Sequence, residues 1–164
     1  MSACRYCIDT SALIDLKNRY PQKVFPGLWR RMEQLVHDER LIAPTDVYEE
    51  LNRGDDEISR WAKQHKSMFH RQDAHLIREA REVVRQSRRL ADTNKIGPHA
   101  DPFVVALALI DHRFGQSQLF QYSCIVVSHE AESKGRRTIA DACKHFGLEC
   151  ITLPTLFSRE GWNF

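Results

Sequence analysis

The sequence lacks the segments that would send a chain to or across a membrane. No apolar run reaches the roughly 20 residues that a membrane-spanning helix needs. The first residues, Met1-Ser2-Ala3-Cys4-Arg5, do not have the layout of a signal peptide. We therefore expect no membrane association and a cytoplasmic location, where cysteine thiols stay reduced.

The sequence also lacks a strong charge of one sign and a glycine-rich phosphate loop. Its formal net charge is only +2, so the overall charge does not predict nucleic-acid binding, and only local clusters of charge can. No internal repeat or low-complexity tract is present. With 164 residues, of which 42% are hydrophobic, the composition predicts a single globular domain over residues 1–164.

Cysteines are few and odd in number, and their positions do not predict a metal site. Cys4 and Cys7 have the spacing of a zinc-binding pair, but they lie in a predicted strand, where residues three apart face opposite sides. The other three cysteines, Cys124, Cys143 and Cys150, lie in apolar segments and are predicted to be small core residues.

Short apolar runs alternate with segments of helical periodicity. Four runs predict strands: Tyr6–Ile8, Leu41–Pro44, Cys124–Val127 and Glu149–Thr152. Helical patterns lie between them, including an amphipathic helix over about 73–91 and a nearly all-apolar helix over 103–110. Because the strands are continuously apolar, they predict an α/β fold with a mostly parallel sheet that is covered on both faces.

Four acidic residues fall where strand ends and helix starts converge in such a sheet. Asp9 follows the first strand, Glu50 lies in the helix after the second, Asp101 begins the apolar helix, and Glu130 follows the third strand. Chemistry in open α/β sheets is located just beyond the carboxyl ends of the strands. Carboxylates gathered there repel one another unless a cation is present, which makes their recurrence informative.

Asp9 and Asp101 also have simple structural interpretations. Ser11 is the predicted N-cap of the first helix, but Asp9 itself can cap the turn into that helix. Asp101 precedes Pro102, which is the pattern of an N-cap followed by proline at the first helical position. Either carboxylate can therefore be a helix cap rather than a ligand.

The other two acids differ in how readily they are explained by structure alone. Glu50 shares a helix face with Val47 and Leu51, whereas Glu49 points away. A carboxylate on the apolar side needs a partner, because burial without one costs several kcal/mol. Glu130 lies in a polar loop, where solvation is the ordinary interpretation.

Taken together, these segments resemble the PIN domain, and the resemblance covers most of the chain. It rests on the order and spacing of Ile8-Asp9-Thr10-Ser11-Ala12-Leu13, Ile42-Ala43-Pro44, Val47-Tyr48-Glu49-Glu50-Leu51, Ala100-Asp101, Val104-Val105-Ala106-Leu107-Ala108 and Ile125-Val126-Val127-Ser128. The segment Phe25-Pro26-Gly27-Leu28-Trp29 and the ending His129-Glu130 resemble a less studied PIN-like branch of bacterial and archaeal proteins.

The resemblance implies a Rossmann-like α/β/α sandwich and a metal-dependent ribonuclease. Many such proteins are the toxin of a toxin–antitoxin pair of the VapC type, so the resemblance implies an RNA substrate, an antitoxin partner and a homodimer. It assigns the catalytic and metal-binding acids to Asp9, Glu50 and Asp101. The fourth position departs from the usual pattern, which ends in aspartate, and is assigned to Glu130, with Glu132 as the alternative.

The implied metal is Mg²⁺ or Mn²⁺, because hard cations prefer oxygen ligands. We expect Asp9 and Asp101 to bind it directly, and Glu50 and Glu130 to bind through water or orient the attacking water. Thr10 or Ser11 can assist, and the two histidines beside the acids, His99 and His129, can approach a phosphate.

Two basic segments are candidates for binding RNA. One is a stripe on the 73–91 helix that includes Arg78, Arg81 and Arg85, and the other is a loop with Lys134, Arg136 and Arg137. The alternatives are an ordinary solvated face, with Glu79 and Glu82 forming ion pairs, and a surface for an acidic antitoxin segment.

Two other functions are compatible with parts of the pattern. A phosphatase with Asp9 as the nucleophile is disfavoured, because no second aspartate follows two residues later. A catalytically inactive PIN-like module that binds RNA or a protein is the main alternative. The intact set of acids argues against it, because an inactive protein has no need for mutually repelling carboxylates.

Overall fold

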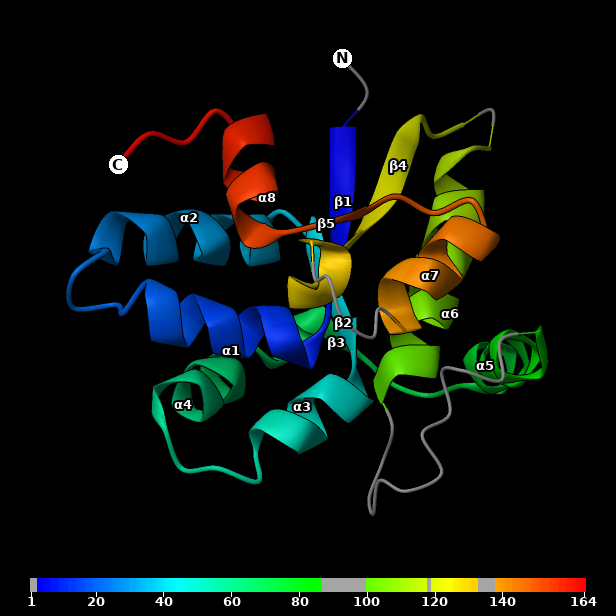
Figure 1. Ribbon diagram of the computed structural model, residues 1–164, viewed down its shortest axis with the longest axis horizontal. Coiled ribbons are helices and arrows are strands. Elements are labelled where there is room, and N and C mark those ends of the chain that lie inside the picture. Colours follow the sequence, from blue (N-terminus) through cyan, green and yellow to red (C-terminus); the bar gives the residue numbers. More distant parts are fainter. Residues whose placement is uncertain (1–2, 87–99, 118, 133–137) are drawn as a thin grey trace.

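In this computed structural model, five parallel strands form one central sheet in the order β3-β2-β1-β4-β5 (Figure 1). The structure describes residues 3–86, 100–117, 119–132 and 138–164, without the side chains of residues 100, 101, 132 and 138. The strands are β1 (Ala3–Ile8), β2 (Leu41–Pro44), β3 (Phe69–His70), β4 (Tyr122–Val127) and β5 (Cys150–Ile151). The predicted α/β fold with a parallel sheet is confirmed.

Helices cover both faces of the sheet. They are α1 (Thr10–Arg19), α2 (Pro26–His37), α3 (Thr45–Leu51), α4 (Glu57–Gln64), α5 (Ala74–Gln86), α6 (Ala100–Gly115), α7 (Thr138–His145) and α8 (Leu153–Arg159), with the short 3-10 helices η1 (Lys66–Met68) and η2 (His129–Glu132). In Figure 1, α1, α2 and α8 lie on one side of the sheet, and α5, α6 and α7 lie on the other. The arrangement is the expected α/β/α sandwich.

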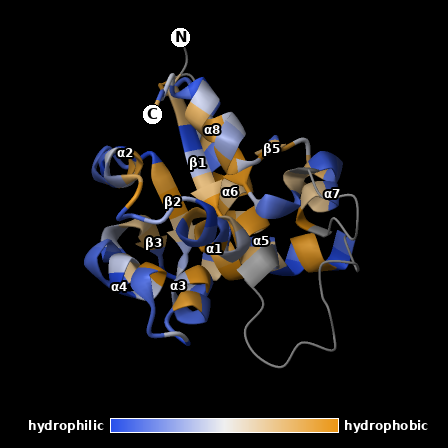
Figure 2. Cartoon of the chain, turned by 60° about the vertical axis from the view of Figure 1, so that its left-hand side comes forward, coloured by the Kyte–Doolittle hydropathy of each residue, from blue (hydrophilic) through white to orange (hydrophobic). Residues whose placement is uncertain are grey.

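The continuous apolar runs are explained by burial on both faces. Every residue of β2 is buried, as are the second half of β1 and the last four residues of β4. Figure 2 shows the hydrophobic residues gathered in the strands and in α6, with hydrophilic residues on the outer helices. Ile8 pairs with Val127, so β1 and β4 end level with each other. Residues that follow these two strands therefore begin at the same edge.

The central helix α6 returns the chain from the carboxyl edge of the sheet to its amino edge. It packs against β1, β2 and β4, and its residues 104–109 are buried. At its last residue, a β-carbon on Gly115 would lie 2.5 Å from the backbone oxygen of Tyr122, so only glycine allows this close approach. Because α6 ends at the start of β4, its first turn lies at the carboxyl edge.

Helix α6 is longer than the predicted 103–110. Polar residues after Ile110 indicated a connection, but the helix continues to Gly115 because these residues have partners. Arg113 pairs with Glu79 of α5 at 2.8 Å, and His112 Nδ1 accepts a hydrogen bond from the backbone N–H of Cys124 at 3.3 Å. A helix can therefore continue through a polar stretch whose side chains bind neighbouring elements.

One strand of the sheet was not among the four that the sequence predicted. Phe69 and His70 form β3 and pair with Ala43 and Pro44. A strand of only two residues is too short to give a periodic pattern. Helix α3 begins at Thr45, directly after β2, and no side chain among the described residues caps it.

The segment after α8 is fixed to the sheet by a partly buried ion pair. Arg40 donates hydrogen bonds of 3.0 and 2.6 Å to Glu160, which also accepts one of 2.7 Å from the Tyr6 hydroxyl. Burial alone would raise the pKa of Glu160, but these hydrogen bonds and the charge of Arg40 outweigh it and hold that pKa below its ordinary value. This contact positions the last residues of the chain beside α2.

None of the helices formed by the described residues is long and apolar enough to cross a bilayer.

Candidate functional site

The direction of the chain reverses at the central strand of the sheet. From β1 the chain continues to β2 and β3 on one side, and it later returns to form β4 and β5 on the other side. Crevices at such switch points, beyond the carboxyl ends of the strands, are the usual ligand sites of open α/β sheets. Asp9 follows β1 and Ser128 follows β4 at this point.

The Asp9 carboxylate is buried and densely hydrogen-bonded. Only 3% of Asp9 is exposed, and its Oδ1 accepts hydrogen bonds of 2.8 Å from the backbone N–H of Ala12 and from the Ser11 hydroxyl. Its Oδ2 accepts one of 2.6 Å from the Ser128 hydroxyl. Asp9 is thus the N-cap of α1, and the prediction that Ser11 caps this helix was wrong. The alternative that Asp9 caps the turn is confirmed.

A small group of hydroxyls joins the ends of β1 and β4. The Ser128 hydroxyl, besides donating to Asp9, accepts from the backbone N–H of Glu130 at 3.1 Å. The Ser11 hydroxyl accepts from the backbone N–H of His129 at 3.2 Å. Thr10 Oγ1 is buried, and no partner for it lies within the described part of the chain. The edge therefore holds the Asp9 carboxylate in one orientation through hydroxyls from both strand ends.

Helix α3 brings acidic side chains to the neighbouring strand end. Glu50 is half-buried and Glu49 is exposed, as the helical spacing predicted. The same face also carries Asp46, which is 2% exposed and lies one turn before Glu50. Asp46 was not predicted as a site residue, although it follows β2 almost as directly as Asp9 follows β1. Its spacing of four residues from Glu50 was the signal that could have identified it.

Asp46 is a buried acid with one clear partner. Gln72, in the loop after β3, donates hydrogen bonds from Nε2 to both Asp46 oxygens, and the one to Oδ2 measures 2.7 Å. Burial raises the pKa of Asp46, the charges of Glu49 and Glu50 raise it further, and the Gln72 hydrogen bonds oppose the rise. The ionised form of Asp46 therefore lowers the stability of the folded protein.

Replacing Asp46 with asparagine should stabilise the protein at neutral and alkaline pH. An acid whose pKa is raised by folding destabilises the fold fully above the folded pKa, and this cost disappears as the pH falls below the unfolded value. In urea unfolding, Asp46→Asn should be more stable than the wild type at pH 8, and the difference should shrink towards pH 4. The control, Asp141→Asn on the exposed face of α7, should show no such trend. A difference that is constant with pH would refute the argument.

Asp101 lies at the same edge, in the first turn of α6. One turn later, Val104 accepts a hydrogen bond of 3.5 Å through its backbone oxygen from Cys7 Sγ, near the carboxyl end of β1. The backbone of Asp101 is thus beside the switch point, and it lies within the helix rather than at the predicted capping position. Its side chain is outside the described residues, as are the side chain of Glu132 and the whole of His99.

Glu130 is fixed by a helix start rather than solvated. It is half-buried in η2, and its Oε2 accepts a hydrogen bond of 3.0 Å from the backbone N–H of Ile139 in the first turn of α7. Next to it, half of the His129 side chain is exposed, and its Nδ1 lies 3.6 Å from Asp15 Oδ2. The Glu130 carboxylate therefore has a structural role that the sequence did not indicate.

The donor atoms at this edge suit a hard divalent cation, but the described side chains do not complete a metal site. Carboxylate oxygens are the ligands that Mg²⁺ and Mn²⁺ prefer. Over the residues that the structure describes, no three His, Cys, Asp or Glu side chains are grouped closely enough to hold an ion. A centre with three carboxylates would therefore need a side chain that lies outside the described residues. Asp101 is a candidate, because its backbone lies beside β1, the strand that Asp9 follows.

The predicted basic segments are only partly available for a ligand. Arg85 makes two hydrogen bonds to Glu82, as the solvated-face alternative expected, whereas Glu79 pairs with α6 instead. Arg78 is exposed, and Arg81 lies at a largely apolar groove of about 500 Å³ beside the first turn of α6. The groove is lined by Gln72, Ile77, Ala80, Arg81, Val84, Pro102 and Phe103. Lys134, Arg136 and Arg137 lie outside the described residues.

Comparison with known proteins gave one family and no curated relative. No curated protein matches this chain. A family model described as a domain of unknown function matches residues 6–164, which includes the whole of the carboxyl edge and every predicted acid. Because the match spans nearly all of the sequence, the chain belongs to this family, DUF4411.

Proposed function

We propose that this chain is a Mg²⁺- or Mn²⁺-dependent endoribonuclease whose active site is the carboxyl edge of β1 and β4. The observation that carries the proposal is the buried Asp9 carboxylate at the switch point, held by Ser128 of the neighbouring strand. Acid-bearing helices α3 and α6 begin beside the same edge, with Asp46 and Asp101 in their first turns. The resemblance to PIN domains supports the same assignment.

In this proposal the chain's own residues bind and orient the reactants. A divalent ion, when bound, would contact the scissile phosphate, activate a water and stabilise charge on the leaving oxygen. Asp9 and Asp101 would be its ligands, while Glu50 and Glu130 would bind through water or orient the attacking water. Ser11 and Ser128 hold the Asp9 carboxylate in one orientation, and burial limits competition from bulk water.

The surroundings of the edge offer a path for RNA. The groove beside α6 is lined by Pro102, the residue after Asp101, and by Arg81 of α5, which supplies positive charge to it. Arg78 is exposed on the same helix. By resemblance, we further propose a cytoplasmic toxin that acts as a homodimer and is bound by an antitoxin. Growth arrest on expression, relieved by a neighbouring gene product, would support that role.

The nuclease proposal is tested by RNA cleavage with and without a divalent metal. Purified protein should cleave a labelled RNA with Mg²⁺ or Mn²⁺ and lose this activity in EDTA. Asp101→Asn and Asp9→Asn should lower the rate by at least about 100-fold, because each removes an oxygen charge from the reacting centre. The matched control, Asp141→Asn, should cleave like the wild type.

Other outcomes of this assay contradict the proposal. Cleavage that persists in EDTA, or unchanged rates in both variants, would refute the metal-dependent mechanism. RNA binding without turnover in any metal would instead identify a non-catalytic binding module, the alternative that the sequence left open.

A further inference from the structure

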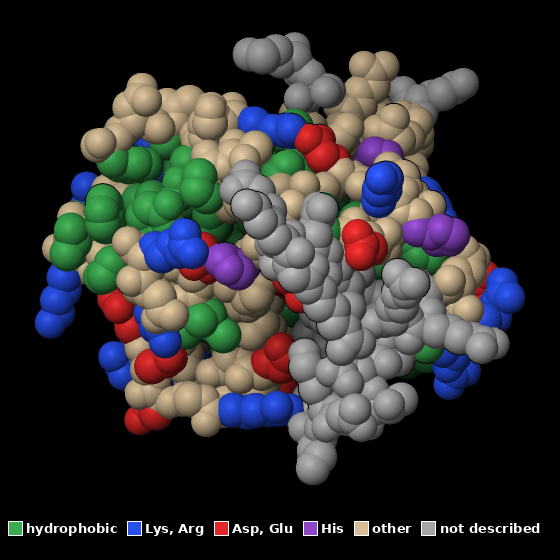
Figure 3. Space-filling view, in the orientation of Figure 1, with side chains coloured by type: hydrophobic (Ala, Val, Ile, Leu, Met, Phe, Trp, Pro, Cys, Tyr) green, Lys and Arg blue, Asp and Glu red, His purple; other side chains and the backbone are tan. Residues whose placement is uncertain are grey.

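A partly exposed aromatic surface lies where α1, α2 and the segment after α8 meet, and Figure 3 shows the hydrophobic area on the left. We define it by Tyr20, Val24, Phe25, Trp162 and Phe164. Its rings, with buried Phe157 beneath them, contact one another in a row with centroids 5.3 to 6.3 Å apart. Val24 is 67% exposed and Phe164 is 64% exposed. Apolar side chains that are exposed side by side on a surface are typical of a binding site.

Cations without partners border the aromatic surface. Lys23, Arg30 and Arg31 are exposed, and none of their side chains makes an ion pair or a hydrogen bond within the described part of the chain. A β-carbon placed on Gly27 would lie 3.6 Å from the Phe164 ring and 3.9 Å from the Arg30 guanidinium. The Phe164 ring and the Arg30 guanidinium therefore both lie next to the first turn of α2. Aromatic rings interleaved with cations are typical of surfaces that bind single-stranded nucleic acid.

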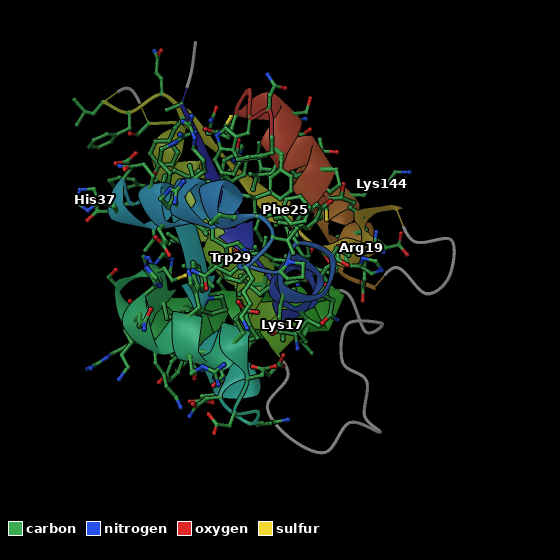
Figure 4. All side chains as sticks on the ribbon, turned by 90° about the vertical axis from the view of Figure 1, so that its left-hand side faces the viewer. Lys17, Arg19, Phe25, Trp29, His37 and Lys144 are labelled. Carbon is green, nitrogen blue, oxygen red and sulfur yellow. The ribbon has the colours of Figure 1, made fainter. Side chains whose placement is uncertain are left out.

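Helix α1 connects this surface to the carboxyl edge. It begins beside Asp9 and, with its 10 residues, extends about 15 Å to Tyr20. Along it, His129 lies 3.6 Å from Asp15, whose other oxygen lies 2.6 Å from Arg19 Nε. Figure 4 looks onto this side of the molecule and shows Arg19 and Phe25 on it. Helix α1 thus spans the distance between the carboxyl edge and the aromatic surface.

We propose that the aromatic surface binds single-stranded RNA that extends away from the carboxyl edge. Bases stack on the exposed Phe164 ring and on the partly exposed rings beside it, and phosphates contact Lys23 and Arg30. This inference rests on the proposed ribonuclease function, because it assigns the surface to the same substrate. A second copy of the chain is disfavoured as the occupant, because symmetric pairing would place the same cation-bordered patch, with Lys23, Arg30 and Arg31, on both sides of the interface.

The test is RNA binding without metal, measured by fluorescence anisotropy in EDTA so that cleavage does not interfere. The probes are labelled oligouridines of about 4 and about 12 nucleotides, lengths within the range that single-strand-binding domains cover. Phe164→Ser should weaken binding of the longer probe by about fivefold or more. The pair Lys23→Gln and Arg30→Gln should lower the dependence of log K on log salt by about 1.4, because two phosphate contacts are lost.

Matched controls lie elsewhere on the molecule. Phe114→Ser removes a ring that is 56% exposed at the end of α6, and Arg53→Gln with Lys63→Gln removes two exposed cations near α3 and α4. Both controls should bind the longer probe like the wild type. The shorter probe should bind the wild type more weakly than the longer one, and the aromatic-surface variants should lose this advantage of length.

Three results would overturn the inference. The first is unchanged affinity and salt dependence in the aromatic-surface variants. The second is loss of affinity for an acidic peptide, such as polyglutamate, with RNA binding intact. The third is a shift from dimer to monomer in light scattering without a change in RNA affinity. If the wild type cleaves RNA and its aromatic-surface variants bind RNA normally, this inference is refuted and the nuclease proposal is not. RNA binding that depends on the surface, without any cleavage, refutes the nuclease proposal alone.

Discussion

Asp9→Ala should lower the free energy of unfolding by about 2–4 kcal/mol, because it removes a helix cap and leaves buried donors without an acceptor. The donors are the backbone N–H of Ala12 and the hydroxyls of Ser11 and Ser128, all within 2.9 Å of the carboxylate. Asp9→Asn keeps an acceptor for Ala12 and should cost only about 1 kcal/mol. Urea unfolding followed by circular dichroism measures both values.

A second N-cap in the same chain provides the control for Asp9. Asp56 caps α4 by accepting from the backbone N–H of Ser59 at 3.0 Å, but 41% of its side chain is exposed, and it pairs with Lys17. Asp56→Ala should therefore cost only about 1 kcal/mol. Equal losses at the two caps would show that burial and the link to β4 add nothing. Asp9→Asn also separates stability from chemistry, because a folded variant without cleavage places the carboxylate in the reaction.

Trp29→Ala should lower the free energy of unfolding by about 3–5 kcal/mol, a large share of the total stability of an ordinary domain. Trp29 is fully buried in α2, and its ring meets the edge of Trp61 with centroids 5.8 Å apart. Its Nε1 donates a hydrogen bond of 2.6 Å to the backbone oxygen of Tyr20, at the end of α1. The indole therefore joins α1 to α2 and α4 through both packing and a hydrogen bond.

Trp29→Phe separates the two contributions of this side chain. It keeps an aromatic ring in the core but loses the indole N–H, so it should cost about 1–3 kcal/mol, less than alanine. Trp162→Ala, which removes a half-buried indole outside the core, should also cost less than Trp29→Ala. A loss at Trp162 as large as that at Trp29 would contradict the central role assigned to the buried indole.

The sequence predicted the sheet and most helices because burial leaves a direct imprint on residue type. Strands covered on both faces must be apolar throughout, and β1, β2 and β4 were recognised by this feature. Partners distant in the sequence determined the remaining boundaries. The end of α6 depends on Glu79 and on the backbone of Cys124, and β3 exists only because Phe69 meets Ala43 beside it.

The candidate site was predicted less completely than the fold. The position of Asp9 and the inward face of Glu50 were both correctly predicted, because strand ends and helical periodicity are local properties. The burial of Asp46 and the attachment of Glu130 to the start of α7 were missed. Both depend on side chains or backbone groups that reach the site from other elements, namely Gln72 and Ile139.

By itself, the sequence determined that this chain forms a parallel α/β sheet and that acids follow its central strands. Hydrophobic periodicity and residue type suffice for this, since they reflect burial of each segment separately. Only the tertiary structure decided that Asp9 is a buried helix cap that accepts a hydrogen bond from Ser128. It also decided that the buried Asp46 carboxylate binds Gln72, and that the Phe164 ring packs near Gly27 and Arg30. These contacts join residues far apart in the chain, and their geometry follows from how the whole core packs.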